Sequence, residues 1–264
     1  MARAPSRTEV IEPPVIEIKG LCKAFDDNVL FENANLTIYE GKTVAIVGES
    51  GSGKSVLLKI MMGLEEPDSG SVEYKGHNVF AMNQKELDDY RQHIGYVFQN
   101  DALFDSMNVL ENIGYSMREH TKAGDAEIQA RAAECLKVVG LEEWRLKLFP
   151  AELSGGQRKR VGIARAIAVK PDILFYDEPT QGLDPQSITR IGELIAQLQR
   201  ELNATSVVVT HDMRTAFDKA DFIALLHEGR FDHVGTPKQF ARSPAEPVRE
   251  FIADALEELQ EFLG

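Results

Sequence analysis

The feature that most constrains the fold of this chain is the glycine-rich segment GESGSGKS at residues 48–55. Its glycines allow successive backbone N–H groups to curl around a phosphate, while Lys54 reaches the β- and γ-phosphates and Ser55 offers its hydroxyl to Mg²⁺. An apolar run at 44–47 precedes the segment and another at 56–62 follows it, which gives the strand, loop and helix that such a loop requires. The candidate phosphate-binding residues are Gly48, Glu49, Ser50, Gly51, Ser52, Gly53, Lys54, Ser55 and Val56.

Composition limits the class of protein. The 264 residues suffice for one large domain or for a core with a subdomain, and 43% of them are hydrophobic. No apolar run reaches the roughly 18 residues of a membrane helix, so the chain is not expected to span a bilayer by itself. Lys and Arg total 29 against 42 Asp and Glu, and the net charge of −13 argues against a nucleic-acid partner. Cys22 and Cys135 indicate neither a disulfide framework nor a metal cluster, which fits a reducing cytosol.

The pattern of apolar and polar residues divides the chain into segments. Residues 1–14 lack the apolar core of a secretory signal and are expected to be a disordered lead-in. Alternation favours strands between 15 and 76, and apolar residues at three- and four-residue spacing favour helices at about 103–168. Continuously apolar runs at 173–176 and 206–209 are typical of parallel strands covered on both faces. The expected fold class is α/β, a phosphate-loop core with an antiparallel β subdomain and a helical subdomain.

Two adjacent carboxylates follow the apolar run at 173–176. Asp177 is placed to hold Mg²⁺ through its water shell, and Glu178 to orient and polarise an attacking water. Taken alone, the pair would read equally well as surface acids after a strand. Together with the phosphate loop, Asp177 and Glu178 predict a hydrolytic site.

The segment LSGGQ at residues 153–157 comes directly before a basic helical stretch. A hydroxyl, two glycine N–H groups and a helix N-terminus make a second anion site. Because a phosphate held by residues 48–55 needs no second cradle in the same chain, this site suggests contact with a nucleotide held mainly by another copy. The alternative is a simple helix cap. The residues concerned are Ser154, Gly155, Gly156 and Gln157.

Two further polar residues follow apolar strands. Gln99 ends the run at 94–98, where an amide can sense both Mg²⁺ and the water, although a surface glutamine is the alternative. His211 follows the run at 206–209, and a neutral imidazole there could hydrogen-bond a γ-phosphate. The remaining histidines show no metal-ligand spacing and are expected at the surface: His77, His93, His120, His227 and His233.

The order of these motifs, with Gly182-Leu183-Asp184 between Glu178 and His211, resembles the ATPase subunit of an ATP-binding cassette (ABC) transporter over about residues 15–240. The resemblance implies an ATP hydrolase whose cofactors are ATP and Mg²⁺. It implies that Ser55, Gln99 and Asp177 hold the metal. It also implies that Glu178, His211 and Gln99 serve catalysis.

The same resemblance implies a homodimer that works under integral-membrane permease subunits. The LSGGQ segment of one copy would close over the ATP of the other, and Asp184 would lie in the loop that links the two sites. Gln99 and the loop after it would face the membrane subunits. Phe25 takes the place of the aromatic that stacks on adenine, with a core position beside Leu21 as the alternative.

A narrower resemblance concerns the segments 103–109, 117–121 and 150–154. They are similar to the ATPases of the Mce and lipid-asymmetry (Mla) systems, which energise the movement of phospholipid or hydrophobic compounds between the bacterial inner membrane and the outer envelope. The resemblance implies a place at the cytoplasmic face of the inner membrane and a periplasmic lipid-binding protein in the same complex. Two alternatives stay open, an ATPase for polar amino acid or ion uptake and a soluble ABC protein that acts on ribosomes or DNA.

The C-terminal segment 241–264 predicts an amphipathic helix. Its hydrophobic stripe consists of Val248, Phe251, Ile252, Ala255, Leu256, Leu259, Phe262 and Leu263. A lone helix of this length is marginal in water, so the stripe is expected to dock. The candidate docking sites are the second copy or an accessory subunit, and, alternatively, the chain's own core.

Overall fold

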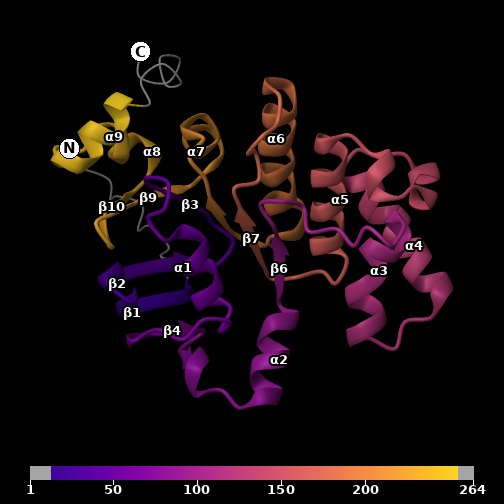
Figure 1. Ribbon diagram of the computed structural model, residues 1–264, viewed down its shortest axis with the longest axis horizontal. Coiled ribbons are helices and arrows are strands. Elements are labelled where there is room, and N and C mark those ends of the chain that lie inside the picture. The colour runs from indigo at the N-terminus through magenta and orange to yellow at the C-terminus, as the bar shows by residue number, and fades with distance from the viewer. Residues whose placement is uncertain (1–12, 255–264) are drawn as a thin grey trace, which may run out of the picture.

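Two β-sheets and the helices around them form the computed structural model, which describes residues 13–254 (Figure 1). The antiparallel sheet has the strand order β2-β1-β4-β5. The larger sheet has the order β10-β9-β3-β8-β7-β6, with β9 to β6 parallel and β10 antiparallel to β9. The strands are β1 (Pro14–Phe25), β2 (Asn28–Tyr39), β3 (Thr43–Val47), β4 (Ser69–Tyr74), β5 (His77–Asn78), β6 (Ile94–Val97), β7 (Ile173–Asp177), β8 (Thr205–Val209), β9 (Phe222–His227) and β10 (Arg230–Gly235).

Helices connect and cover the strands, so the expected α/β class is confirmed. The α-helices are α1 (Lys54–Met61), α2 (Gln84–Gln92), α3 (Val109–His120), α4 (Asp125–Val138), α5 (Gly155–Ile167), α6 (Pro185–Leu202), α7 (Met213–Lys219), α8 (Pro237–Ala241) and α9 (Glu246–Asp254). Short 3₁₀ helices are η1 (Val79–Ala81), η2 (Glu143–Lys147) and η3 (Pro150–Glu152). Within residues 13–254, none of these helices is both long and apolar enough to cross a membrane.

The parallel strands bring the predicted motifs to one edge of the sheet. Every residue of β3, β7 and β8 is buried, as their continuously apolar sequences predict. The carboxyl ends of such strands are where ligands bind in open α/β sheets. Strand β6 ends at Val97, one residue before the expected end, because Phe98 leaves the sheet and is 44% exposed.

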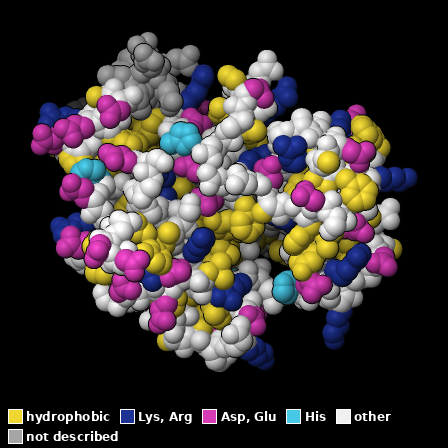
Figure 2. All heavy atoms as spheres, in the orientation of Figure 1, with side chains coloured by type: hydrophobic (Ala, Val, Ile, Leu, Met, Phe, Trp, Pro, Cys, Tyr) yellow, Lys and Arg dark blue, Asp and Glu magenta, His cyan; other side chains and the backbone are white. Residues whose placement is uncertain are grey.

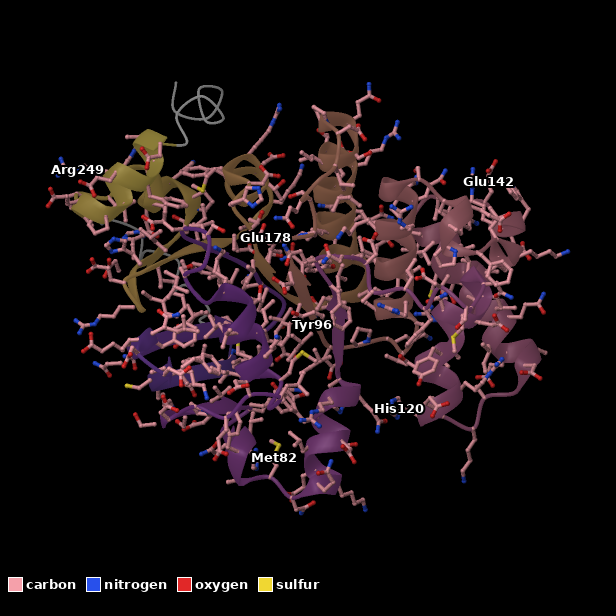
Figure 3. The ribbon with its side chains drawn as sticks, in the orientation of Figure 1. Met82, Tyr96, His120, Glu142, Glu178 and Arg249 are labelled. Atoms are coloured by element: carbon pink, nitrogen blue, oxygen red, sulfur yellow. The ribbon has the colours of Figure 1, made fainter. Side chains whose placement is uncertain are left out.

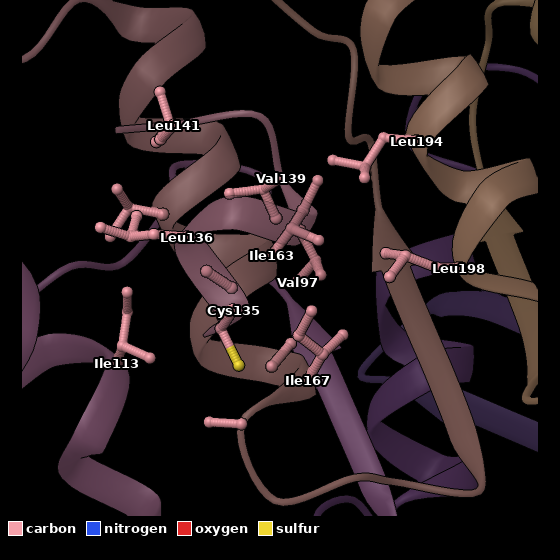
Figure 4. Close-up of a cluster of buried hydrophobic side chains, with 14 of the residues drawn as sticks. Val97, Ile113, Cys135, Leu136, Val139, Leu141, Ile163, Ile167, Leu194 and Leu198 are labelled. Carbon is pink, nitrogen blue, oxygen red and sulfur yellow. The ribbon is translucent and has the colours of Figure 1, made fainter. Parts of the chain in front are cut away.

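Each face of the parallel sheet carries its own hydrophobic core. On β7, Ile173 and Phe175 face a cluster that includes α1 and the antiparallel sheet. The alternate residues Leu174 and Tyr176 face a second cluster, formed with the helical subdomain and α6. Figure 4 shows part of this second cluster, in which Cys135 of α4 lies among aliphatic side chains.

The helical subdomain consists of α3, α4 and α5 and lies across β6 and β7 from the antiparallel sheet (Figure 1). Asn108 and Ser154 cap α3 and α5 through their side chains. The approach of α3 to α4 is close at Gly114, where an added Cβ would lie 2.4 Å from Cγ2 of Ile128. A side chain at position 114 would therefore push the two helices apart.

The structure corrects expectations about the lead-in and about the histidines. Pro14, placed in the lead-in, begins β1, and the Pro13 carbonyl accepts a hydrogen bond from the Glu40 N–H; residues 1–12 lie outside the described part. Three histidines expected at the surface, His93, His227 and His233, are half-buried, and the ring of His233 packs against Phe240 with centroids 5.5 Å apart.

The described part of the tail docks on its own chain. Val248 is fully buried, and Phe251 and Ile252 pack against the same cluster as Phe240 of α8. The alternative of docking on the chain's own core is therefore confirmed for α9, and the hypothesis of docking elsewhere is wrong for that helix. The rest of the predicted stripe lies outside the described residues: Ala255, Leu256, Leu259, Phe262 and Leu263.

Candidate nucleotide site

The phosphate loop joins β3 to α1 in a conformation that only glycine permits at two points. Gly53, the N-cap of α1, has φ 94°. Gly48 has φ 156°, and a Cβ there would lie 2.3 Å from the carbonyl oxygen of Leu226 on the neighbouring strand. These constraints leave the backbone N–H groups at the helix N-terminus free of side chains that would block a phosphate.

Lys54 lies inside the loop. Its Nζ donates hydrogen bonds to the carbonyl oxygens of Gly48, at 2.9 Å, and Glu49, at 2.7 Å. Burial lowers the pKa of Lys54, and the carboxylates of Glu178 and Asp177 partly oppose this effect. A phosphate bound in the loop would give this buried ammonium the negative partner that favours its charged form.

Ser55 and Asp177 meet although 122 positions separate them in the sequence. The Ser55 Oγ donates to Oδ1 of Asp177 at 2.7 Å, and the Asp177 carboxylate is buried at the end of β7. A hydroxyl and a carboxylate side by side are oxygen ligands of the kind Mg²⁺ prefers. Within the described residues, no three His, Cys, Asp or Glu side chains are grouped to hold a metal.

Glu178 and His211 are paired. Oε2 of Glu178 lies 2.8 Å from Nδ1 of His211 and also accepts a hydrogen bond from the His211 backbone N–H at 3.3 Å. Glu178 has φ 45°, an uncommon left-handed conformation for a residue other than glycine, and its N–H donates to the Val209 carbonyl. The backbone thus directs the carboxylate toward the phosphate loop and the end of β8.

A cavity of about 330 Å³ brings Lys54, Ser55, Glu178 and His211 together, while Asp177 is not among its lining residues. Gln99 lines it too, and its side-chain amide donates to Oε1 of Gln181. The residues lining the cavity are Leu30, Ser50, Gly51, Gly53, Lys54, Ser55, Val56, Gln99, Glu178, Gln181 and His211. A second cavity of about 650 Å³ shares Leu30, Ser50, Gly51 and His211 with the first and reaches α9 at Phe251.

The LSGGQ segment and Asp184 are not among the residues that line either cavity. Ser154 is the N-cap of α5 and forms a capping box with Gln157, and Asp184 caps α6 by accepting from the Ser187 N–H at 3.0 Å. Within one chain, these residues act as helix caps and take no part in the lining of the two cavities.

Phe25 lies at the end of β1 and is 43% exposed, so the alternative of a core aromatic is wrong. The Lys23 ammonium is 4.7 Å from the centre of its ring. Phe25 is not among the described residues that line the two cavities.

The basic helix after LSGGQ has a role that the sequence did not suggest. Lys159 is 2% exposed and its Nζ donates to the carbonyl oxygen of Gln99 at 2.6 Å. Arg165 donates to the carbonyl oxygens of Asp101 and Ala102 at 3.0 and 2.7 Å. Helix α5 therefore holds the loop after Gln99 in place.

Comparison with known proteins agrees with this geometry. Residues 31–181 match the family model described as ABC transporter. The chain belongs to the ABC transporter family. It is the ATPase subunit of such a transporter, has the P-loop fold of ABC cassettes, and binds and hydrolyses ATP.

The relatives and structures similar to this ABC ATPase are also cassettes. Sulfate/thiosulfate import ATP-binding protein CysA of Bradyrhizobium diazoefficiens is 38% identical over 92% of this chain and 70% of its own length. Probable ribonucleotide transport ATP-binding protein mkl of Mycobacterium leprae is 39% identical over 90% and 68%. The cbiO1 structure from Clostridium perfringens, part of the cbiONQ complex, superposes with a TM-score of 0.80 at 30% identity over 95% of this chain and 100% of its own.

A dimeric cassette is among the similar structures. The post-hydrolysis state of MJ0796 bound to ADP and Pi superposes with a TM-score of 0.77 at 35% identity, over 84% of this chain and 98% of its own. ABC ATPases of this kind dimerise and pair with membrane permease subunits.

Sequence reasoning missed Gln181 and Tyr96, which the fold places on predicted site residues. Gln181 binds Gln99 across the cavity, and the Tyr96 hydroxyl donates to Asp177 at 2.9 Å. A signal for Tyr96 was present, since it lies three positions before Gln99 in a strand whose neighbour ends in Asp177. Nothing in the sequence pattern marks Gln181.

Proposed function

We propose that this ABC ATPase hydrolyses Mg²⁺-bound ATP with the residues that converge on the cavity of about 330 Å³. Ser55, Gln99 and Asp177 would hold Mg²⁺, which would neutralise charge on the β- and γ-phosphate oxygens. Lys54 and the N–H groups of the loop bind the phosphates. Glu178 orients the attacking water, and His211 hydrogen-bonds the γ-phosphate.

The observation that carries this assignment is the meeting of four strand ends at one loop. The groups at the ends of β6, β7 and β8 all line the cavity next to the loop after β3. The Glu178–His211 pair can open without backbone movement, because the His211 side chain is 59% exposed. Glu178 and His211 would then exchange their contact with each other for contacts with the attacking water and the γ-phosphate.

The second part of the proposal is a head-to-tail homodimer. Ser154, Gly155, Gly156 and Gln157 form the N-terminus of α5 and do not line the cavities of their own chain. This N-terminus suits the γ-phosphate of a nucleotide on the partner copy. Asp184, at the start of α6, lies in the connection between the two half-sites, and Phe25 stacks on adenine.

The permease docks, in this proposal, beside the loop after Gln99. Phe98, Phe104 and Tyr115 are 44%, 40% and 37% exposed, and the rings of Phe104 and Tyr115 lie 4.8 Å apart. On the face shown in Figure 2, hydrophobic side chains lie over the middle of the molecule and the helical subdomain, among charges of both signs. Exposed aromatics of this kind mark protein interfaces. Docking would hold the ATPase at the cytoplasmic face of the inner membrane.

For the cargo, we propose phospholipid, moved by an Mla/Mce-type permease with a periplasmic lipid-binding protein. The support is the sequence of the docking region, 103–121, and of the segment before LSGGQ. The second candidate is import of a small anion or another polar solute, favoured by the likeness to sulfate/thiosulfate import proteins. The catalytic residues are the same in both cases, so the identity of the permease determines the cargo.

Purification of the tagged chain from membranes, followed by identification of its permease and mass spectrometry of bound lipid, tests the cargo. A phospholipid transporter predicts bound phospholipid, an envelope leaky to detergents when the gene is disrupted, and normal sulfate uptake. Complementation with a Glu178→Gln protein is the matched control and should fail to restore the barrier. An intact barrier with a sulfate or amino acid requirement would overturn the lipid proposal and leave the ATPase standing.

A further inference from the structure

Tyr96 contacts a proposed metal-binding carboxylate without itself lining the nucleotide cavity. The Tyr96 hydroxyl donates a hydrogen bond to Oδ2 of Asp177 at 2.9 Å, while the Ser55 hydroxyl donates to Oδ1 at 2.7 Å. Resting on the Mg²⁺ site proposed above, we propose that Tyr96 is a positioning residue that fixes the Asp177 carboxylate for the metal.

The sheet register makes this contact specific. Tyr96 of β6 pairs with Phe175 of β7, so Asp177 is two residues further along β7 and on the same face. A tyrosine is long enough to reach this diagonal neighbour, which a shorter side chain would not. Figure 3 places Tyr96 and Glu178 together in the middle of the molecule, between the antiparallel sheet and the helical subdomain.

The surroundings of the tyrosine keep it in place as a donor. Its ring packs against Phe98, with centroids 4.4 Å apart. The phenol of a tyrosine is protonated at neutral pH and can therefore donate to the carboxylate. A hydroxyl that donates to a carboxylate makes a charge-assisted bond, stronger than one between neutral groups.

The two oxygens of Asp177 then have separate tasks. Ser55 and Oδ1 of Asp177 would hold the metal, which would supply positive charge beside the phosphates. Oδ2 keeps Tyr96 throughout, so the buried carboxylate does not rotate and its second oxygen is never left unpaired. The expected role of Tyr96 is thus to lower the cost of orienting Asp177.

The test is Tyr96→Phe, which keeps the ring and removes the donor. Affinity for a fluorescent ATP analogue is measured in EDTA and against a Mg²⁺ titration, and Mn²⁺ binding to the nucleotide-bound protein is followed by electron paramagnetic resonance. In EDTA we expect a change within about twofold, since the phosphate loop is untouched. The Mg²⁺ concentration required for half-maximal tightening should rise by about tenfold, the scale for losing a hydrogen bond to a charged group.

Tyr176→Phe is the matched control. It removes a buried phenol hydroxyl from the other face of β7, and we expect it to leave the Mg²⁺ requirement unchanged. A double-mutant cycle guards against general damage, because adding Tyr96→Phe to Asp177→Asn should have little further effect on Mn²⁺ binding if the tyrosine acts through that carboxylate.

The outcomes distinguish failure of the proposed metal site from failure of the positioning role of Tyr96. If nucleotide binding to the unmodified protein does not depend on Mg²⁺ at all, the proposed metal site is wrong, and the role of Tyr96 with it. If the unmodified protein shows the dependence and Tyr96→Phe shows the same midpoint, the metal site stands and the positioning role is overturned. An equal shift in Tyr176→Phe, or additive effects with Asp177→Asn, would also overturn it.

Discussion

At the scale of single residues, the site is a set of polar groups that bind one another and can exchange partners. Lys54 binds the carbonyls of its own loop, Ser55 binds Asp177, and Glu178 binds His211. These contacts give hydrogen-bond partners to polar groups that would otherwise be unpaired in the protein interior. They therefore hold the side chains near the positions that the substrate requires. The proposed chemistry at this scale depends on the carboxylate of Glu178.

Glu178→Gln should retain ATP affinity and lose hydrolysis by roughly 100-fold or more, the scale for removing a preorganised catalytic group. The amide keeps the size of the side chain but is a poor acceptor for a proton from water. Steady-state ATPase rates and nucleotide binding on the same protein give the measurement. Lys54→Ala is the contrasting variant, expected to weaken nucleotide binding itself. Near-normal turnover by the Glu178→Gln protein would refute the assigned role.

At the scale of elements, the ends of strands β3, β6, β7 and β8 position the site, and helix α5 holds the loop after Gln99 in place. The sequence predicted the loop after β3, the carboxylates after β7 and His211 after β8, because each is a polar residue next to an apolar strand. Contacts such as those of Gln181 and Lys159 were not predictable, since they depend on how loops and helices dock in the folded chain. The exposure of Phe98 was missed for the same reason, because apolar character alone does not tell where a strand ends.

Gly114→Ala should destabilise the helical subdomain by about 1–3 kcal/mol, the range for overpacking, because its Cβ would lie 2.4 Å from Ile128. Gly124→Ala is the control, as nothing lies within 4 Å of a Cβ at that position. Burial raises the pKa of Cys135 to about 11, so its thiol is un-ionised at neutral pH and reacts when the subdomain opens. Faster labelling of Cys135 in Gly114→Ala, and not in Gly124→Ala, is the expected result; equal rates would contradict the close packing.

At the scale of the whole molecule, the proposed dimer gives one chain the halves of two sites. The phosphate loop lines the cavity of about 330 Å³, and the LSGGQ segment caps α5 outside that lining. Lys159 and Arg165 of α5 hold the loop after Gln99, so the helix that would meet the partner's nucleotide also supports the proposed permease surface. A movement at one of these surfaces is expected to be felt at the other.

The tail is predicted to have two parts with different effects. Truncation after Asp254 removes residues 255–264 alone and should weaken dimer or complex assembly while leaving the melting temperature within about one degree. Phe251→Ala should instead lower the melting temperature, because that side chain packs against the core formed with α8. Size-exclusion chromatography with light scattering and thermal unfolding distinguish the two. Unchanged assembly after the truncation would contradict a partner-binding role for the end of the tail.

The most direct measurement of the central claim, hydrolysis at sites shared between two copies, is complementation of two inactive variants. Ser154→Arg should bind ATP and not hydrolyse it, and Lys54→Ala should not bind it. Copies that carry different tags and are purified as the heterodimer contain one site with both Lys54 and Ser154 intact, so about half of the normal ATPase rate should return. An inactive heterodimer, with both chains folded and paired, would contradict the shared site.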